Sequence, residues 1–165
     1  MEEDYKDYYE IALVCQNGHV ISDRVSGDTK GSVKYCPVCG AGSTDKCGSC
    51  GEFIRGFNKK VDPAEYRIKR APHQCHRCGE LYPWTKDAIQ TFERIIDAID
   101  VFKDEEKAVL RTSITDLIEF TPNTCQAIRA VKGLSIKIKE TWGWGIIEEI
   151  LKDISPEDIK ARLGI

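Results

Sequence analysis

Seven cysteines and one histidine in the first half of the chain have the spacing of metal ligands. They form one C-x-x-x-H pair, in the segment CQNGH, and three C-x-x-C pairs that are each followed by glycine. Structural zinc sites bind four thiolate or imidazole ligands in a tetrahedron, so eight such donors are the number that two ions need. The sequence therefore predicts two Zn²⁺ ions as cofactors. The predicted ligands are Cys15, His19, Cys36, Cys39, Cys47, Cys50, Cys75 and Cys78.

The order of the pairs leaves two ways of sharing the ions. In a tandem arrangement the first two pairs bind one ion and the last two pairs bind the other, and each gap within a site is long enough for a hairpin. In an interleaved cross-brace the first pair joins the third and the second joins the fourth, as in ubiquitin-ligase finger domains. We expect the tandem arrangement. His73 and His76 flank Cys75 and are alternative ligands in the last pair.

The predicted sites have the composition of structural rather than catalytic centres. A catalytic zinc ion usually keeps one position open for water, whereas eight ligands for two ions leave none open. Iron–sulfur clusters also use four cysteines, but the histidine and the C-x-x-C-G turns favour zinc. The chain has no H-E-x-x-H, no G-x-S-x-G and no phosphate-binding glycine loop. We expect no catalytic residues; an effector enzyme without a recognisable motif and a redox-responsive zinc switch are the alternatives.

Composition places the chain among soluble globular proteins, with 41% hydrophobic and 31% charged residues. It has no recognisable signal peptide, and its apolar runs are far shorter than the roughly 20 residues of a membrane span. We therefore expect a cytoplasmic protein whose cysteines are reduced. The one cysteine outside the pairs, Cys125, lies among helix-forming residues and is expected to be a buried apolar side chain.

The pattern of secondary structure changes near Trp84. Before this residue, short β-favouring runs flank the cysteine pairs, which is typical of zinc ribbons; after it, apolar residues follow the helical period. The predicted fold class is α+β, with tandem zinc ribbons built from short β-hairpins followed by an α-helical domain. We place the double-ribbon domain at residues 1–84 and the helical domain at 85–165. The expected strand runs are Ile11–Val14, Val20–Ile21, Val33–Tyr35 and Phe53–Arg55.

Four helical segments are expected in the second part. The first carries an apolar stripe over residues 88–102, and the second begins at Asp104, where acidic residues meet the positive end of the helix dipole. The third opens at Thr121, which is followed by proline, and its apolar face continues to Trp142 despite intervening glycines. The last begins at Ser155, a typical N-cap residue.

Two surfaces are candidates for partner binding. The net charge of −3 gives no general nucleic-acid signal, but one basic stretch interspersed with aromatic residues could contact phosphates and bases. The alternative is a solvated loop. Trp142 and Trp144, between glycines, could form a protein-binding or dimerisation patch, or belong to the core. The residues of the basic stretch are Lys59, Lys60, Arg67, Lys69, Arg70 and Arg77.

The motifs CQNGH, YCPVCG, KCGSCGEFIRG and CHRCGELYPWT occur in an order that resembles a bacterial family called domain of unknown function 2321. Its specific parts are IRG at Ile54–Gly56 and YPWT at Tyr82–Thr85, since cysteine pairs alone recur in many families. The resemblance implies a double zinc ribbon followed by a helical region in a bacterial cytoplasmic protein, without an established activity. Together these observations predict a non-enzymatic, zinc-binding interaction module that acts as an adaptor or regulator and binds protein or nucleic acid.

Overall fold

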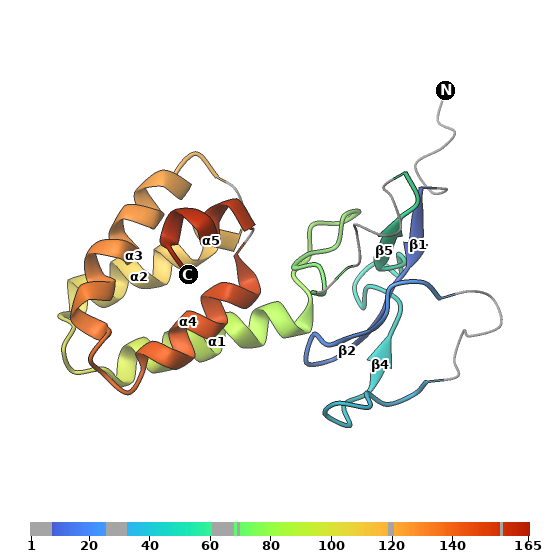
Figure 1. Cartoon of the computed structure of the whole chain (residues 1–165), viewed down its shortest axis with the longest axis horizontal. Helices are drawn as coiled ribbons and strands as arrows, with labels where there is room; N and C mark the ends of the chain where they lie inside the picture. The colour runs from blue at the N-terminus through green and yellow to red at the C-terminus, as the bar shows by residue number, and fades with distance from the viewer. Residues whose placement is uncertain (1–7, 26–32, 61–67, 69, 119–120, 156) are drawn as a thin grey trace. The chain divides into compact units, whose positions relative to one another are not determined.

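The chain has an α+β fold in which short antiparallel strands precede a set of helices (Figure 1). The structure is a computed structural model that describes residues 8–25, 33–60, 68, 70–118, 121–155 and 157–165. It divides into two compact units, Met1–Thr85 and Lys86–Ile165, and each unit has its own buried core.

Two small antiparallel sheets form the first unit. One pairs the first strand with the last, and the other has three strands in the order β3-β2-β4. Only Ala12 separates β1 from β2; it is fully buried, and its N–H donates to the carbonyl of Ile54 at 2.9 Å. The chain therefore passes from one sheet to the other without a loop. The described strands are β1 (Tyr9–Ile11), β2 (Leu13–Cys15), β3 (Val20–Ser22), β4 (Ser43–Thr44) and β5 (Arg55–Asn58).

The core of the first unit is small and includes two of the predicted metal ligands. Within the described residues, a buried cluster this small cannot by itself offset the conformational entropy of the chain, so these residues need a further source of folding free energy. The side chains of Val20 and Trp84 cover the cluster in part. Its buried members are Ala12, Val14, Cys47, Ile54, Ala71, Cys75 and Tyr82.

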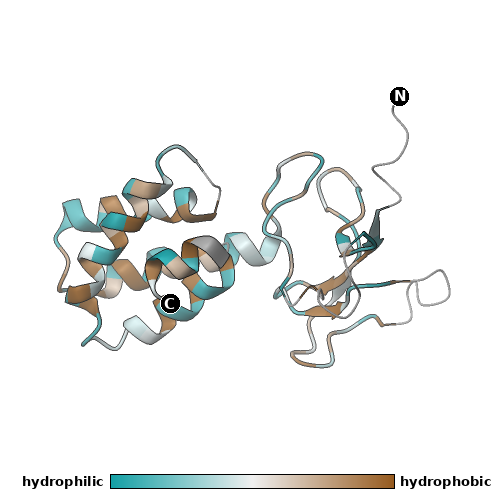
Figure 2. Cartoon of the chain, turned by 45° about the horizontal axis from the view of Figure 1, so that its top comes forward, coloured by the Kyte–Doolittle hydropathy of each residue, from teal (hydrophilic) through white to brown (hydrophobic). Residues whose placement is uncertain are grey.

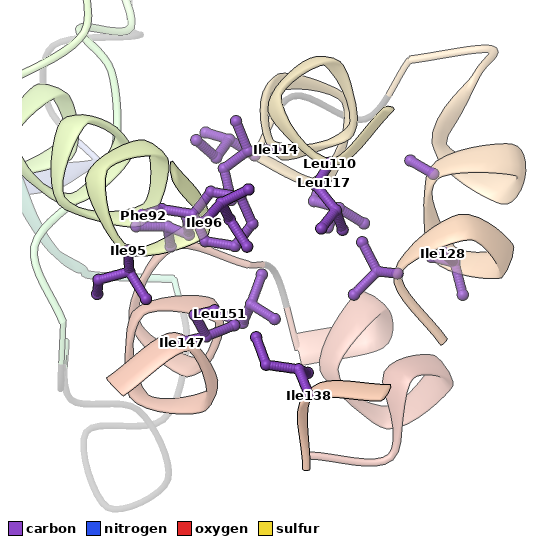
Figure 3. Close-up of a cluster of buried hydrophobic side chains, with 14 of the residues drawn as sticks. Phe92, Ile95, Ile96, Leu110, Ile114, Leu117, Ile128, Ile138, Ile147 and Leu151 are labelled. Carbon is purple, nitrogen blue, oxygen red and sulfur yellow. The ribbon is translucent and has the colours of Figure 1, made fainter. Parts of the chain in front are cut away.

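Helices enclose a larger apolar core in the second unit, where α2 packs along α3 and α3 also meets α5. The helices carry both hydrophobic and hydrophilic residues (Figure 2), and side chains from α1 to α4 meet in the interior (Figure 3). The most deeply buried include Phe92, Leu117 and Leu151. The helices are α1 (Pro83–Ala98), α2 (Asp104–Ile118), α3 (Thr124–Ile138), α4 (Trp144–Ile154) and α5 (Glu157–Leu163).

The segment expected to be one helix from Thr121 to Trp142 is different in the structure. The Thr121 hydroxyl donates to Oδ1 of Asp116 at 2.6 Å, so it closes the turn after α2 instead of capping α3. At the other end α3 stops at Ile138, and a separate helix, α4, follows. Gly143 allows this second turn, because a Cβ there would lie 2.6 Å from Cδ1 of Ile99.

Candidate metal centres

Each C-x-x-C-G segment forms the same tight turn, a knuckle. In the Cys47 knuckle, the Gly51 N–H donates to the Cys47 carbonyl at 2.9 Å, and the Cys47 N–H donates to the Glu52 carbonyl at 2.8 Å. The knuckles that begin at Cys36 and Cys75 repeat both bonds. The turn requires a left-handed backbone after the second cysteine, which only glycine adopts without strain. The φ angles are +74° for Gly40, +73° for Gly51 and +73° for Gly79.

In the Cys36 and Cys75 knuckles, this turn also favours the metal-binding form of the first cysteine. Burial raises the pKa of the Cys36 thiol. Hydrogen bonds from the backbone N–H groups of Cys39 and Val38 and from neighbouring thiols outweigh this effect, so the pKa falls to about 7. The same balance lowers the pKa of Cys75 to about 6. Because a metal ion binds the thiolate, the knuckle backbone favours the form that coordinates.

The first four predicted ligands meet in one group. The Nδ1 atom of His19 lies 3.5 Å from Sγ of Cys15, 3.3 Å from Sγ of Cys39 and 3.7 Å from Sγ of Cys36. The Sγ atoms of Cys15 and Cys39 are 3.7 Å apart. Three sulfurs and one imidazole nitrogen therefore surround a single point, with Cys15 and Cys36 on the buried side.

The last four predicted ligands form the second group. The Sγ atoms of Cys47 and Cys78 are 3.9 Å apart, and those of Cys50 and Cys75 are 3.6 Å apart. In each group all four donor atoms lie within 4.8 Å of one another. As in the first group, the first ligand of each pair is buried and the second is exposed.

These separations fit one tetrahedral metal ion in each group. Metal–sulfur bonds of about 2.3 Å and metal–nitrogen bonds of about 2.0 Å place sulfurs about 3.8 Å from one another and about 3.5 Å from the nitrogen. The measured sulfur pairs are 3.6 to 3.9 Å apart. A disulfide would need about 2.05 Å. A four-iron cluster would spread the sulfurs further, because each cysteine binds a different iron atom. Both groups could thus hold a metal ion.

The grouping follows the order of the sequence. An interleaved cross-brace would place Cys15 beside Cys47, whereas the structure places Cys15 with the Cys36 knuckle. Neither His73 nor His76 belongs to the second group. The His73 carbonyl instead accepts hydrogen bonds from the Tyr82 N–H at 3.0 Å and from the Thr85 hydroxyl at 2.9 Å.

A comparison with protein families identifies the chain. The model of a family described as "Uncharacterized protein conserved in bacteria (DUF2321)" matches residues 8–163. The chain belongs to the DUF2321 family. No curated protein and no solved structure matches it. The DUF2321 match spans both the knuckles and the helical unit.

The IRG motif of this DUF2321 protein brings backbone segments of the first unit together. Ile54 is fully buried in the core of the first unit. A Cβ on Gly56 would lie 2.3 Å from the Asp23 carbonyl oxygen and 2.9 Å from both the Ala12 nitrogen and the Glu10 carbonyl oxygen. Three backbone segments therefore meet at a point where only glycine fits. A glycine inside a β-favouring run is the sequence signal for such an approach.

The YPWT motif packs beside both groups, a role that the sequence reasoning missed. Tyr82 is 3% exposed, and its ring stacks on that of Trp84 with centroids 4.6 Å apart and planes inclined by 16°. The indole N–H of Trp84 donates to the Pro72 carbonyl at 2.9 Å. Pro83 is the first residue of α1, where a missing N–H costs nothing. The motif thus joins the end of the Cys75 knuckle to the start of a helix.

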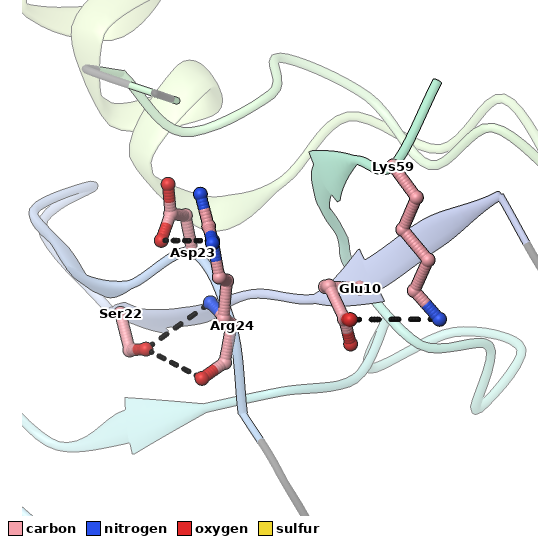
Figure 4. Close-up of polar contacts among 5 residues, drawn as sticks. All are labelled: Glu10, Ser22, Asp23, Arg24 and Lys59. Atoms are coloured by element: carbon pink, nitrogen blue, oxygen red, sulfur yellow. Dashed lines mark hydrogen bonds and ion pairs between the residues drawn. The ribbon is translucent and has the colours of Figure 1, made fainter. Parts of the chain in front are cut away.

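Much of the basic stretch is engaged within the first unit. Lys59 forms an ion pair with Glu10 at 3.5 Å (Figure 4). The Nζ of Lys60 lies 3.5 Å from the ring centroid of Tyr8. Arg77 binds the Glu52 carboxylate at 2.7 Å, which links the two knuckles of the second group, and Arg70 also has an intramolecular interaction. Arg67 and Lys69 lie outside the described residues.

The remaining candidates lie in the second unit. Trp142 is 65% exposed, whereas Trp144 packs against the helical core with the Nζ of Lys139 5.6 Å from its ring centroid. No helix among the described residues has the length and apolarity needed to cross a membrane.

Cys125 is exposed, so the prediction that it is buried was wrong. Helix α3 begins at Thr124, whose buried hydroxyl donates to the Asp116 carbonyl at 2.8 Å. The next residue is rotated by about 100° around the helix axis, toward solvent. There the Arg162 guanidinium donates to the Cys125 sulfur at 3.3 Å.

Proposed function

We propose that the protein binds two structural Zn²⁺ ions and acts as a non-enzymatic interaction module. The observation that carries this proposal is the geometry of the two donor groups, each of which has four protein donors at the separations of one tetrahedral ion. A full set of four leaves no position for a substrate or an activated water. The ions would therefore act as scaffolding, and the work of the protein would lie on the surfaces they organise.

Zinc is the metal that this donor chemistry favours. Thiolates and imidazole suit zinc, which imposes a tetrahedron without redox chemistry of its own. Since Cys47 and Cys75 belong to the small core of the first unit, zinc binding there would also supply folding free energy. The proposal places the protein in a reducing cytoplasm, where thiols stay available to the metal.

A protein is the partner that the exposed surface favours. Three large apolar side chains around the Cys36 knuckle are accessible: Val33 is 37%, Tyr35 is 68% and Val38 is 75% exposed. Exposed aromatic and aliphatic residues are typical anchors of protein interfaces. In contrast, Lys59 and Arg77 of the basic stretch already pair with carboxylates, which makes a nucleic-acid partner the second choice.

Metal analysis tests the first half of the proposal. The purified full-length protein is expected to contain two zinc ions per chain by plasma mass spectrometry. Loss of one donor group should remove one ion, so the double variant Cys36→Ser/Cys39→Ser is expected to retain about one zinc per chain. Cys125→Ser, which removes a cysteine outside both groups, should retain two. One ion or none in the unmodified protein would contradict the proposed sites.

Substitution at the knuckle tests the second half. The double variant Tyr35→Ser/Val38→Ser is expected to retain both zinc ions but to lose at least about tenfold in recovery of the partner by affinity capture, as expected for interface anchors. Ile136→Ser is the control, because Ile136 is 76% exposed in the second unit. Equal recovery by all three proteins would exclude the knuckle as the binding surface. Salt-sensitive binding of the unmodified protein to oligonucleotides would favour the nucleic-acid alternative.

A further inference from the structure

The ring of Trp84 packs against the first donor group. Gly18 lies between the ligands Cys15 and His19 and has a left-handed φ of +83°. A Cβ on Gly18 would lie 3.1 Å from both Cβ and Cγ of Trp84, so the indole covers the backbone of this turn directly. The hydrogen bond from the indole to the Pro72 carbonyl holds the ring in this position.

The ring of Tyr82 packs against the second donor group. Tyr82 belongs to the same buried cluster as Cys47 and Cys75. Its side chain is 3% exposed, so the ring lies inside the cluster that contains these two ligands. Because Tyr82 stacks on Trp84, two rings in contact extend from the buried cluster that contains Cys47 and Cys75 to the backbone of the first group.

The backbone on either side of the stack also joins the groups. Strand β2 ends at Cys15 and pairs with β4, which lies between the Cys36 and Cys47 knuckles. The Ile54 N–H donates to the Asp45 carbonyl at 2.8 Å, just after β4, and the Ile54 carbonyl accepts from Ala12. Among the described residues, the two ribbons therefore share one buried cluster.

We infer that the Tyr82–Trp84 stack couples the two metal sites, so that an ion in one site raises the affinity of the other. The inference rests on the proposed zinc binding. The small core cannot order the metal-free chain, so the first ion must offset the entropy of ordering the shared core and the stack. The second ion then binds a turn that Trp84 already holds in place, so the entropy cost of ordering the shared core is not incurred again. Trp84 is thus a positioning residue for the first site.

A double-mutant cycle with Co²⁺ as the probe tests this coupling. A Co²⁺ ion bound by four sulfurs and a Co²⁺ ion bound by three sulfurs and one nitrogen have different visible absorption bands. Each site can therefore be titrated separately in the full-length chain. With Trp84 present, Cys36→Ser/Cys39→Ser is expected to weaken Co²⁺ binding at the four-cysteine site at least about tenfold. In the Trp84→Ala background the same double substitution should change that affinity less than about twofold.

Two further variants separate coupling from general damage. Trp84→Phe keeps a ring on Tyr82 and should retain most of the coupling, even if Trp84→Ala fails to fold. Trp142→Ala removes an exposed tryptophan of the second unit and should leave the coupling intact. Equal affinity of the four-cysteine site with and without the first site, in the otherwise unmodified chain, would overturn the inference while leaving two zinc sites in place. A full tenfold effect in Trp84→Ala would also overturn it. Failure of the unmodified chain to bind Co²⁺ would instead reject the proposed sites.

Discussion

Replacing Cys47 with serine is expected to unfold the first unit and to leave the helices of the second unit folded. Cys47 is 4% exposed and is both a predicted ligand and a member of the small core. A structural zinc ion contributes an apparent free energy of about 10–16 kcal/mol, which is as large as the whole stability of a typical domain. The second unit has its own larger core and contains neither donor group. Amide NMR signals of residues 8–60 should collapse, while circular dichroism retains the helical signal.

Cys125→Ser provides the matched control for this experiment. It makes the same chemical change at an exposed cysteine of the second unit, outside both donor groups. The amide spectrum of the first unit should therefore stay dispersed. If Cys47→Ser also abolishes the helical signal, the two units unfold as one and the proposed separation at about residue 85 is wrong.

Gly56→Ala is expected to destabilise the first unit by about 4 kcal/mol or more, the range reached only when a substitution meets a specific structural conflict. The added Cβ would lie 2.3 Å from the Asp23 carbonyl oxygen. All three of its nearest neighbours are backbone atoms, so no side chain can move aside. Urea unfolding of the zinc-loaded protein at fixed free zinc, followed through amide signals of the first unit, would measure the change.

The control for this substitution is Gly48→Ala. A Cβ at Gly48 would meet no atom within 4 Å, although this glycine lies inside the Cys47 knuckle. We expect its effect to stay within about 0.5 kcal/mol, as for other surface substitutions. Equal stability of the two variants would show that the backbone around residue 56 adjusts freely, against the close packing described above.

Features that depend on local geometry could be predicted from the sequence. A knuckle needs two residues between cysteines and a glycine in the left-handed region, so the three C-x-x-C-G turns are visible as spacing alone. Helix α2 was predicted to begin at Asp104, and it does, because acidic residues at the start of a helix are a local signal. The α+β fold class and the family were predicted correctly for the same reason.

Features that depend on distant partners could not be predicted. The pairing of β1 with β5 joins segments separated by the CQNGH turn and two knuckles, and strands this short carry no register signal. The contact of Trp84 with Gly18, which lies far earlier in the chain, has no signal in the sequence either. Cys125 was misplaced because its side chain is rotated by about 100° around the helix axis from that of the buried Thr124, one residue earlier.

The contact between Gly18 and Trp84 has a consequence for how the protein is made. The last donor of the first group is Cys39, and the ring that packs against this group comes about 45 residues later. At a synthesis rate of roughly 5–20 residues per second, the ribosome adds Trp84 about 2 to 9 seconds after it has completed that donor group. Zinc that reaches the nascent chain after the donors have left the ribosome, but before Trp84 has, meets all four donors without the ring that holds them. Firm retention of the ion should therefore begin only once Trp84 has left the ribosome.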